Sequence, residues 1–257
     1  MLRIALLIEY EGTKYSGWQS QPNGVTIQST LEQALEKVTQ QAVRILGSGR
    51  TDAGVHAAGQ VAHLDLMRDL SMPIERFPGA INTQLPNSIR VLAAQVVPAQ
   101  FSARFQAIAR EYQYTITIQP RALNRKLSWF CKYKLNPDDL NRCARLILGE
   151  HDFTSFCASI SDTENKVCHV SESVWLADAN YLIYKISGTR FLHHMVRMLV
   201  GTMVEVGRGR WKFDQFQRLL DEPTQDHHKV TAPARGLVLK RVRYPESLTL
   251  FREYYGE

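Results

Sequence analysis

The stretch that most constrains the fold is polar and glycine-rich, residues 47–56, and it lies between two apolar segments. The short apolar run 43–46 predicts the end of a strand, and the alternation of apolar and polar side chains at 60–66 predicts a second, half-buried strand. Because glycine tolerates positive φ angles and close approach of other groups, we expect a compact loop between these strands. Loops held by a rigid sheet often carry reactive groups, and this loop carries Asp52 two residues after Arg50.

The same loop also fits a purely structural interpretation, a hairpin in which Asp52 is a turn residue. On spacing alone this is the more frequent outcome, because short loops of glycine and aspartate are common. A phosphate-binding P-loop is disfavoured, since the glycines are not followed by Gly-Lys-Ser or Gly-Lys-Thr. Spacing therefore leaves a structural and a catalytic role open for Asp52.

The first half of the chain predicts strands and helices in alternation. Besides the two strands around the loop, the apolar pattern predicts strands at 2–10 and 89–97 and helices at 27–40 and 73–81. The resulting order is strand, helix, strand, strand, helix, strand. This order favours an α+β fold in which the helices cover one face of a mainly antiparallel sheet.

The second half predicts similar numbers of elements, with strands at 109–118, 167–177, 181–187 and 235–244 and helices at 136–149, 191–206 and 213–221. A chain of 257 residues accommodates two domains of this size. We place the first domain at 1–107, with the Asp52 loop, and the second at 108–257.

Two residues of the second half have both a structural and a functional interpretation. Tyr112 lies on the face of the strand at 109–118 that becomes more polar toward its N-terminal end, which fits a core tyrosine or one beside a cleft. Arg197 interrupts the apolar surface of the helix at 191–206. Its charge must therefore either extend to solvent or meet an anion.

Arg104 lies between Phe101 and Phe105 in a run without an apolar period. One interpretation is a short strand that pairs with the core, and the other is stacking and phosphate contact with nucleic acid. The region is also basic, because residues 104–145 hold nine basic and three acidic side chains, while the whole chain has a net charge of +6. This clustering favours a phosphate-rich partner, with a solvated basic face as the alternative.

The four cysteines form no Cys-x-x-Cys pair, and the histidines form no His-Glu-x-x-His motif. His193 and His194 are adjacent, so on a helix they would point in different directions. We therefore expect no metal site. The first residues lack the pattern of a secretory signal, and no apolar stretch is long enough to span a bilayer. We expect a cytoplasmic protein with free thiols and no membrane association.

Residues 49–57, Gly-Arg-Thr-Asp-Ala-Gly-Val-His-Ala, resemble the active-site signature of the tRNA pseudouridine synthase A (TruA) family. The family's catalytic aspartate corresponds to Asp52. Four more segments resemble family motifs in the same order along the chain, namely 10–28, 101–114, 191–210 and 232–245. One position departs from the family pattern, because Arg235 stands where the family often has histidine.

The resemblance implies that the protein isomerises uridine to pseudouridine at positions 38, 39 and 40 of the tRNA anticodon arm, without a cofactor. It implies a homodimer whose subunits have two ferredoxin-like or RRM-like α+β domains and a basic active-site cleft between them. It also implies that Tyr112 stacks on the target base, that Arg197 pairs with Asp52, and that Arg104 contacts tRNA. Arg50 would fill the space that the base leaves or hold a phosphate.

Such a reaction breaks the N-glycosidic bond, turns the uracil and joins C5 to C1′, without a redox step, ATP or a metal. An ionised Asp52 can add to the base, add to the sugar or remove a sugar proton, and the sequence leaves these three routes open. A non-catalytic RRM-type RNA-binding module is the alternative function, because it would use the same basic and aromatic residues without Asp52. A carboxylate hydrolase would need a second acid, and the loop holds none.

Overall fold

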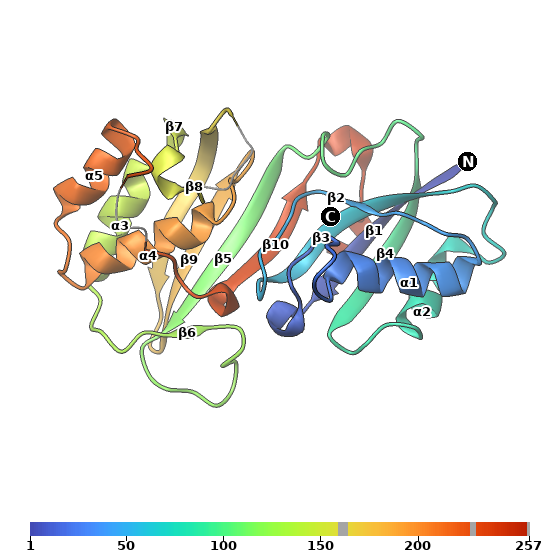
Figure 1. Ribbon diagram of the computed structural model, residues 1–257, viewed down its shortest axis with the longest axis horizontal. Helices are drawn as coiled ribbons and strands as arrows, with labels where there is room; N and C mark the ends of the chain where they lie inside the picture. Colours follow the sequence, from blue (N-terminus) through green and yellow to red (C-terminus); the bar gives the residue numbers. More distant parts are fainter. Residues whose placement is uncertain (159–163, 227–229, 256–257) are drawn as a thin grey trace. The chain divides into compact units, whose positions relative to one another are not determined.

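The computed structural model describes residues 1–158, 164–226 and 230–255. Within these residues the chain forms ten strands, paired almost entirely antiparallel, and helices that pack against them (Figure 1). The predicted α+β class is therefore confirmed. The chain divides into two compact units, Met1–Ile108 with Leu239–Glu257, and Ala109–Val238.

The sheet of the first unit is built around β1 (Leu2–Tyr10). This strand pairs antiparallel with β4 (Ile89–Val97) on one side and with β3 (His56–Leu66) on the other. The short strand β2 (Leu46–Gly47) and the last strand, β10 (Leu237–Arg243), both lie beside β3. Five consecutive residues of β1 have no exposed surface. Since successive side chains of a strand point to opposite faces, the sheet must be covered on both faces.

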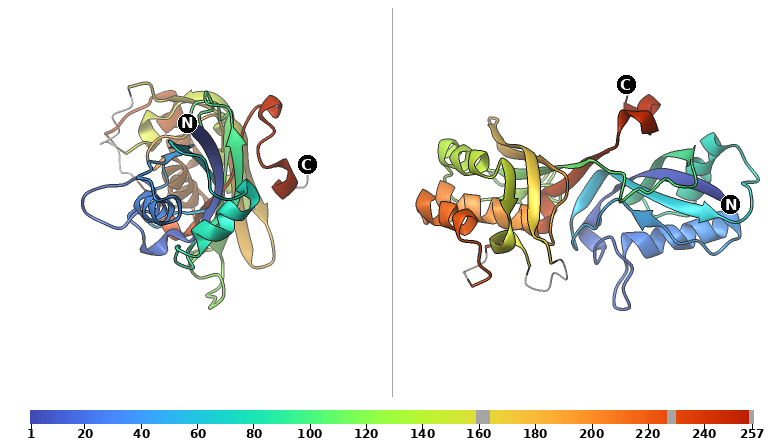
Figure 2. Two further views of the ribbon diagram at one scale, coloured as in Figure 1. Left: turned by 90° about the vertical axis from the view of Figure 1, so that its right-hand side faces the viewer. Right: turned by 90° about the horizontal axis from the view of Figure 1, so that it is seen from above.

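One cover is α1 (Ile27–Thr39), which begins after the predicted N-cap, Thr26. The Thr26 side chain accepts a hydrogen bond from the Ser29 N–H, and the Ser29 hydroxyl accepts one from the Thr26 N–H, so the two form a capping box. The buried apolar residues recur at spacings of three and four, as on one face of a helix: Ile27, Leu31, Ala34 and Leu35. Figure 2 shows α1 on one face of this sheet and the C-terminal segment, with η5 (Glu246–Leu248) and α6 (Arg252–Tyr255), on the other.

The helix predicted at 73–81 is instead a 3-10 turn, η2 (Ile74–Arg76), followed by a short helix, α2 (Phe77–Asn82). Proline is the second residue of α2 and has no N–H to donate to the carbonyl of Ile74. A regular α-helix therefore cannot extend back through the turn. Phe77 and Ile81 of α2 are buried, and α2 packs against α1 and β4.

The second unit has its own antiparallel sheet, in the order β5 (Ala109–Thr117), β9 (Tyr181–Gly188), β8 (Val167–Ala177) and β7 (Gly149–Asp152). The two-residue strand β6 (Trp129–Phe130) pairs parallel with β5. Three helices pack against one another, and the first of them packs against β8: α3 (Pro137–Leu146), α4 (Met195–Gly207) and α5 (Phe213–Asp221). Short 3-10 turns complete the chain: η1 (Gly12–Lys14), η3 (Thr154–Phe156) and η4 (Ala234–Gly236).

Trp175 of β8 fixes two of these helices over one face of the sheet. Its backbone N–H and C=O both bond the side-chain amide of Asn141 on α3, at 2.9 Å each, and its indole N–H lies 3.3 Å from the sulfur of Met203 on α4. Its ring also stacks on Tyr184 of β9, with 4.9 Å between ring centroids. None of the described helices has the length and apolar character needed to cross a membrane.

Two predicted helices in the second unit were too long. The helix predicted at 191–206 begins only at Met195, because His194 has a φ of 64° and cannot continue a right-handed helix toward the N-terminus. The helix predicted at 136–149 begins after Asn136 as expected but ends at Leu146. Gly149, with a φ of 93°, instead starts β7, which the sequence analysis did not predict.

The predicted domains, 1–107 and 108–257, remain a prediction, and the compact units differ from them in the last segment of the chain. Residues from Leu239 onward group with the first unit, because β10 lies beside β3. The Tyr244 hydroxyl reinforces this arrangement by donating a hydrogen bond to the Ala103 carbonyl at 2.6 Å. Sequence patterning finds the strand but not its partner.

Candidate active site

Asp52 is half-buried in the loop that joins β2 to β3. Its carbonyl accepts a hydrogen bond from the Val55 N–H at 3.1 Å, so the chain makes a tight turn directly after the carboxylate. Gly54 within this turn has a φ of 78°, and its N–H donates to the Tyr15 carbonyl at 3.3 Å. The carboxylate is therefore carried by a turn that is itself attached to a neighbouring loop.

The residue before Asp52 is held from two sides. The Thr51 carbonyl accepts a hydrogen bond from the Trp18 N–H at 3.1 Å, and its hydroxyl lies 2.8 Å from that of Tyr10 on β1. Burial raises the pKa of the Tyr10 hydroxyl far above its usual range, so it stays protonated. All of these partners are neutral groups. Their hydrogen bonds hold the backbone at Asp52 independently of ordinary changes in pH.

Two glycines let the neighbouring loop approach this closely. A β-carbon at Gly17, whose φ is 92°, would lie 2.8 Å from the Thr51 carbonyl oxygen. At Gly47, a β-carbon would lie 2.7 Å from the ring of Trp18. Trp18 is only 3% exposed, so this aromatic residue belongs to the core beneath the loop.

Arg50 lies on the same loop as Asp52 but is exposed. The carbonyl before it, that of Gly49, accepts a hydrogen bond from the Gln60 side chain at 3.0 Å, and the other end of the same amide bonds the Ser48 hydroxyl at 2.6 Å. The loop thus presents an exposed cation two residues before a half-buried carboxylate.

Tyr112 lies in the second unit, on β5 and opposite Ile186 of β9. It is half-buried, and its ring meets the ring of Phe191 edge to face, with 5.3 Å between centroids. Tyr114, on the same face of the strand, is fully buried and donates its hydroxyl to the Pro233 carbonyl at 2.8 Å. As predicted, this face is buried at one end and more open toward Tyr112.

Arg197 lies in the first turn of α4 and is half-buried. Its Nε donates to the Ala232 carbonyl at 2.9 Å, and its own carbonyl accepts from the Ala232 N–H at 3.0 Å. The segment carrying Ala232 comes close to the helix at Gly201, where a β-carbon would lie 2.5 Å from the Val230 carbonyl oxygen. These two hydrogen bonds hold Nε of Arg197 against the segment at Ala232, so the side chain does not extend freely into solvent.

The prediction that His193 and His194 lie on a helix and point in different directions is wrong, because neither residue lies in the helix. They precede α4, and their rings pack together with 4.1 Å between centroids and 44° between planes. The sequence did not reveal this, because the helix is prevented from starting earlier by the left-handed backbone of His194, and histidine as a residue type gives no sign of that conformation.

Arg104 is exposed in a turn of the first unit. The structure rejects the short strand considered for 101–105, since these residues form a turn. Phe101 is 1% exposed and belongs to the core, whereas Phe105 is 83% exposed. The two aromatic residues that flank Arg104 therefore have different environments.

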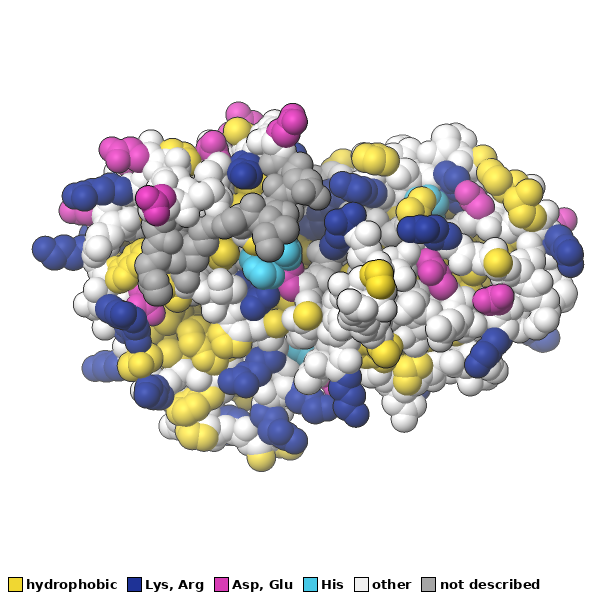
Figure 3. Space-filling model, in the orientation of Figure 1, with side chains coloured by type: hydrophobic (Ala, Val, Ile, Leu, Met, Phe, Trp, Pro, Cys, Tyr) yellow, Lys and Arg dark blue, Asp and Glu magenta, His cyan; other side chains and the backbone are white. Residues whose placement is uncertain are grey.

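The basic segment of the second unit includes the loop between β5 and α3. On the face drawn in Figure 3, basic and apolar side chains alternate over this loop, at the lower edge of the view. Its most exposed apolar residue is Leu123, at 82%, and Tyr133 is 44% exposed. The Arg208 guanidinium lies over the Tyr133 ring, 4.3 Å from its centroid. Cationic and aromatic groups thus occur together here, as they do in proteins that bind nucleic acid.

The predicted site residues fall into two sets, one in each unit. Asp52, Arg50 and Arg104 lie in the first unit, and Tyr112 and Arg197 lie in the second. The residues that hold them were not predicted from the sequence, among them Tyr10, Phe191 and Ala232. These occur within ordinary apolar or loop segments, and the one signal that could have found them is that they lie in the family-like segments 10–28, 191–210 and 232–245.

Comparison with known proteins agrees with the loop signature. The family model described as tRNA pseudouridine synthase matches residues 6–106 and 143–245. A tRNA pseudouridine synthase A of Exiguobacterium sibiricum is 40% identical over 247 residues, covering 96% of this chain and 98% of that protein. The corresponding protein of Halalkalibacterium halodurans is 39% identical (94% and 92% covered), and that of Bacillus subtilis is 38% identical (95% and 99% covered).

These matches extend over most of the chain and include the Asp52 loop and the segment of Arg197. The chain therefore belongs to the tRNA pseudouridine synthases, which are intramolecular isomerases. Its relatives narrow this to the tRNA pseudouridine synthase A (TruA) family. Among solved structures, a Cbf5-Nop10-Gar1 complex aligns with a TM-score of 0.34 at 9% identity, covering 78% of this chain and 53% of that one, a likeness too distant to bear on the fold.

Proposed function

We propose that this protein converts uridine to pseudouridine at positions 38, 39 and 40 of the tRNA anticodon arm, with Asp52 as the essential carboxylate. The observation that supports this most directly is the loop 49–57, which combines the family's signature with a backbone fixed on both sides of Asp52. A reactive group held in this way needs little reorganisation when the substrate binds.

In this proposal the other residues bind and orient the RNA. Tyr112 offers a stacking face to the target base after it leaves the helix, a step that costs a few kcal/mol. Arg50 fills the vacated space or holds a phosphate, and Arg104 contacts the backbone of the tRNA. Arg197 pairs with Asp52 and keeps it ionised, so that the carboxylate can attack the base, attack the sugar or remove a sugar proton.

The same proposal covers the larger organisation. We propose that both units are ferredoxin-like or RRM-like, that they form the basic active-site cleft together, and that the protein is a homodimer. The strand order β4-β1-β3-β2 of the first unit, with a helix after β1 and another before β4, supports the ferredoxin-like assignment for that unit. A tRNA substrate also favours a cytoplasmic location.

Replacing Asp52 tests the function. Asp52→Asn keeps the shape of the side chain and removes its charge, so we expect isomerisation to fall to background while the affinity for tRNA stays within a few-fold of wild type. The measurement is tritium release from tRNA labelled at uracil C5, in single-turnover experiments. Binding without release by the wild-type protein would favour the RRM-type binding module instead, and normal release by the variant would remove Asp52 from the chemistry.

The proposed pair is tested by a double-mutant cycle. Breaking one partner of a fully buried ion pair typically costs about 3–5 kcal/mol, because the other charge is left without compensation, and the cost should be smaller here because both side chains are only half-buried. We therefore expect Arg197→Met and Asp52→Asn to destabilise the protein individually, and the double variant to be less destabilised than the sum. Denaturant unfolding measures all three variants, and simple additivity would show that the two residues do not interact.

A further inference from the structure

The exposed pair Arg104 and Phe105 sits on a turn that is closed by its own hydrogen bonds. The Gln106 N–H donates to the Ser102 carbonyl at 3.2 Å, and the Gln106 side-chain oxygen accepts from the Ser102 N–H at 2.9 Å. The Ser102 hydroxyl in turn accepts from the Phe105 N–H at 3.3 Å. One turn of chain is thus capped at both ends, which limits the conformations available to its outer residues.

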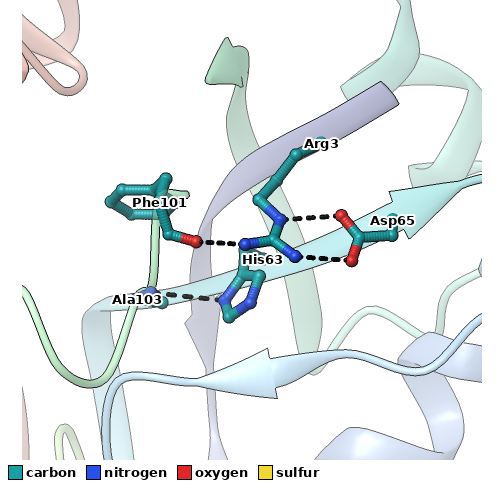
Figure 4. Close-up of polar contacts among 5 residues, drawn as sticks. All are labelled: Arg3, His63, Asp65, Phe101 and Ala103. Atoms are coloured by element: carbon teal, nitrogen blue, oxygen red, sulfur yellow. Dashed lines mark hydrogen bonds and ion pairs between the residues drawn. The ribbon is translucent and has the colours of Figure 1, made fainter. Parts of the chain in front are cut away.

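The turn is attached to the sheet through Ala103, which has no exposed surface. Its N–H donates to Nδ1 of His63 on β3 at 3.2 Å, and its carbonyl accepts from the Tyr244 hydroxyl at 2.6 Å. Both backbone groups of the residue immediately before Arg104 are therefore bound by side chains of the sheet and of the segment after it. Figure 4 shows the His63 side of this attachment.

A second attachment comes from Arg3 on β1. Its guanidinium makes two bonds of 2.7 Å to the Asp65 carboxylate and a third of 2.7 Å to the Phe101 carbonyl (Figure 4). A bidentate pair fixes the plane of the guanidinium, so the third bond has a defined direction. The Phe101 ring also lies between the rings of His63 and Tyr244, at 5.9 and 5.7 Å between centroids.

His63 must be neutral to hold the turn. Because Nδ1 accepts a hydrogen bond from the Ala103 N–H, the proton of the neutral ring is on Nε2. The ring also makes a hydrogen bond with the backbone of Leu46 on β2. The charged groups that face the ring are Arg3 from β1 and Asp65 from its own strand. Burial first, and the Arg3 charge second, lower the pKa of His63 below its usual range, which favours the accepting form.

The attachments leave two side chains pointing outward, an exposed guanidinium and an aromatic ring that is 83% exposed. The Arg104 guanidinium lies over the Phe105 ring, 5.5 Å from its centroid. An aromatic face beside a cation is the combination that binds unpaired nucleotides, by stacking on the base and by attraction to the phosphate. Fixing both in advance lowers the entropic cost of binding.

We propose that Phe105 stacks on an unpaired base of the tRNA substrate, and that Arg3, His63, Asp65 and Tyr244 are positioning residues that hold it there. This inference rests on the proposed function, because it requires an RNA substrate, and it adds a contact residue and its support. Phe105 contributes to binding and not to the chemical step, so its loss raises KM and leaves kcat nearly unchanged.

The first experiment compares Phe105→Ala with Phe105→Trp. Alanine removes the stacking face, so we expect KM and the Kd for an anticodon stem-loop RNA to rise about 5- to 150-fold, equivalent to about 1–3 kcal/mol. Tryptophan keeps a face and should stay within about threefold of wild type. Met67→Ala is the matched control, because Met67 is also exposed in the first unit, at 78%, and should behave as wild type.

The outcomes separate this inference from the proposed function. If wild type neither binds the RNA nor releases tritium, both fall. If wild type is active and Phe105→Ala has an unchanged KM and Kd, only the inference falls. If Phe105→Ala changes the sedimentation coefficient of the free protein, Phe105 belongs to an interface between copies of the chain, and the stacking role is overturned.

The second experiment tests the positioning residues. His63→Leu and Tyr244→Phe each remove one bond to Ala103, and each should raise KM several-fold in the wild-type background. In a background in which Arg104 and Phe105 are both replaced by alanine, the same substitutions should have no further effect on KM, because both residues that they position are gone. Equal effects in both backgrounds would show a merely structural role. Tyr244→Phe removes a single hydroxyl and decides the question where His63→Leu does not fold.

Discussion

The Asp52 loop and the Phe105 turn belong to the same unit, and both are held by hydrogen bonds from distant residues, yet the bonds differ in kind. Around Asp52 the partners are backbone groups and hydroxyls, among them Tyr10 and Thr51. At the turn they include an ion pair, Arg3 with Asp65, and a histidine that must be neutral. The comparison shows that the backbone on both sides of Asp52 is held by groups that do not titrate near neutral pH, whereas the attachment of the turn depends on the protonation state of His63.

The largest loss of stability is expected from Gly17→Ala, which disturbs the contact between the loop of Gly17 and the Asp52 loop. An alanine there has a strained φ of 92° and a β-carbon 2.8 Å from the Thr51 carbonyl oxygen. Strain of this kind costs about 1–3 kcal/mol, and the contact adds to it. We expect denaturant unfolding to show a loss of about 2–4 kcal/mol, together with a sharp loss of tritium release.

The matched control is Gly49→Ala, in the same loop. A β-carbon at Gly49 would have no neighbour within 4 Å, and its φ lies outside the left-handed region. We expect its stability to stay within about 0.5 kcal/mol of wild type. A Gly17→Ala variant as stable as Gly49→Ala would mean that the close approach to Thr51 does not hold the loop.

The second prediction concerns pH, to which the Asp52 loop and the Phe105 turn should respond differently. Folding lowers the pKa of His63 below its ordinary value of 6.5. The contribution of neutral His63 to the stability of the fold is therefore fully present above pH 6.5, and it is lost as the pH falls through the lower pKa of the folded state. Protection of the Ala103 amide from hydrogen exchange, corrected for the intrinsic rate, should therefore fall below pH 6.5, by at most about tenfold per pH unit.

The Trp18 amide, which donates to Thr51 in the loop, should keep its protection over the same range. Asp65 does not produce the change near neutrality, because Arg3 holds its pKa below the ordinary 3.8 and its contribution is lost only at more acidic pH. His63→Leu should remove the pH dependence at Ala103. Parallel loss of protection at both amides would mean that the whole unit opens and the comparison does not hold.

The smallest effect is expected from Arg3→Lys. Lysine keeps the charge but cannot make two parallel bonds to Asp65 and a third to the Phe101 carbonyl. The pair is partly exposed, with 17% and 33% of the two side chains accessible, so solvent screens the loss. We expect a decrease of about 0.5–1 kcal/mol in the free energy of unfolding, and a KM for tRNA that rises while kcat stays unchanged.

Much of the fold followed from the sequence, because apolar periodicity and capping are local. The helix α1 and its Thr26 cap, and the strands β1 and β4, lie where the pattern placed them. The errors arose where backbone dihedral angles or long-range strand pairing determine the bounds and partners of an element. The left-handed residue His194 delays α4, and β10 joins a unit that its position in the sequence does not indicate.

The candidate site shows the same division. Asp52 and Arg50 could be selected from the sequence because residues 49–57 resemble the family's active-site signature. The groups that hold the turn could not, because Arg3 and Phe101 are 98 residues apart and His63 and Ala103 are 40 apart. In the sequence, Arg3 and His63 are single polar residues within apolar strands. Their function in holding the turn becomes visible only in the folded chain, where they lie beside Phe101 and Ala103.

The place of β10 has a consequence for synthesis on the ribosome. Residues 1–108 emerge first, but the strand that lies beside β3 begins only at Leu237. At typical elongation rates the intervening chain takes on the order of ten seconds to appear, during which one edge of β3 is incomplete. An uncovered strand edge invites pairing with other chains. The nascent first unit therefore exposes this strand edge to other chains until β10 has been synthesised.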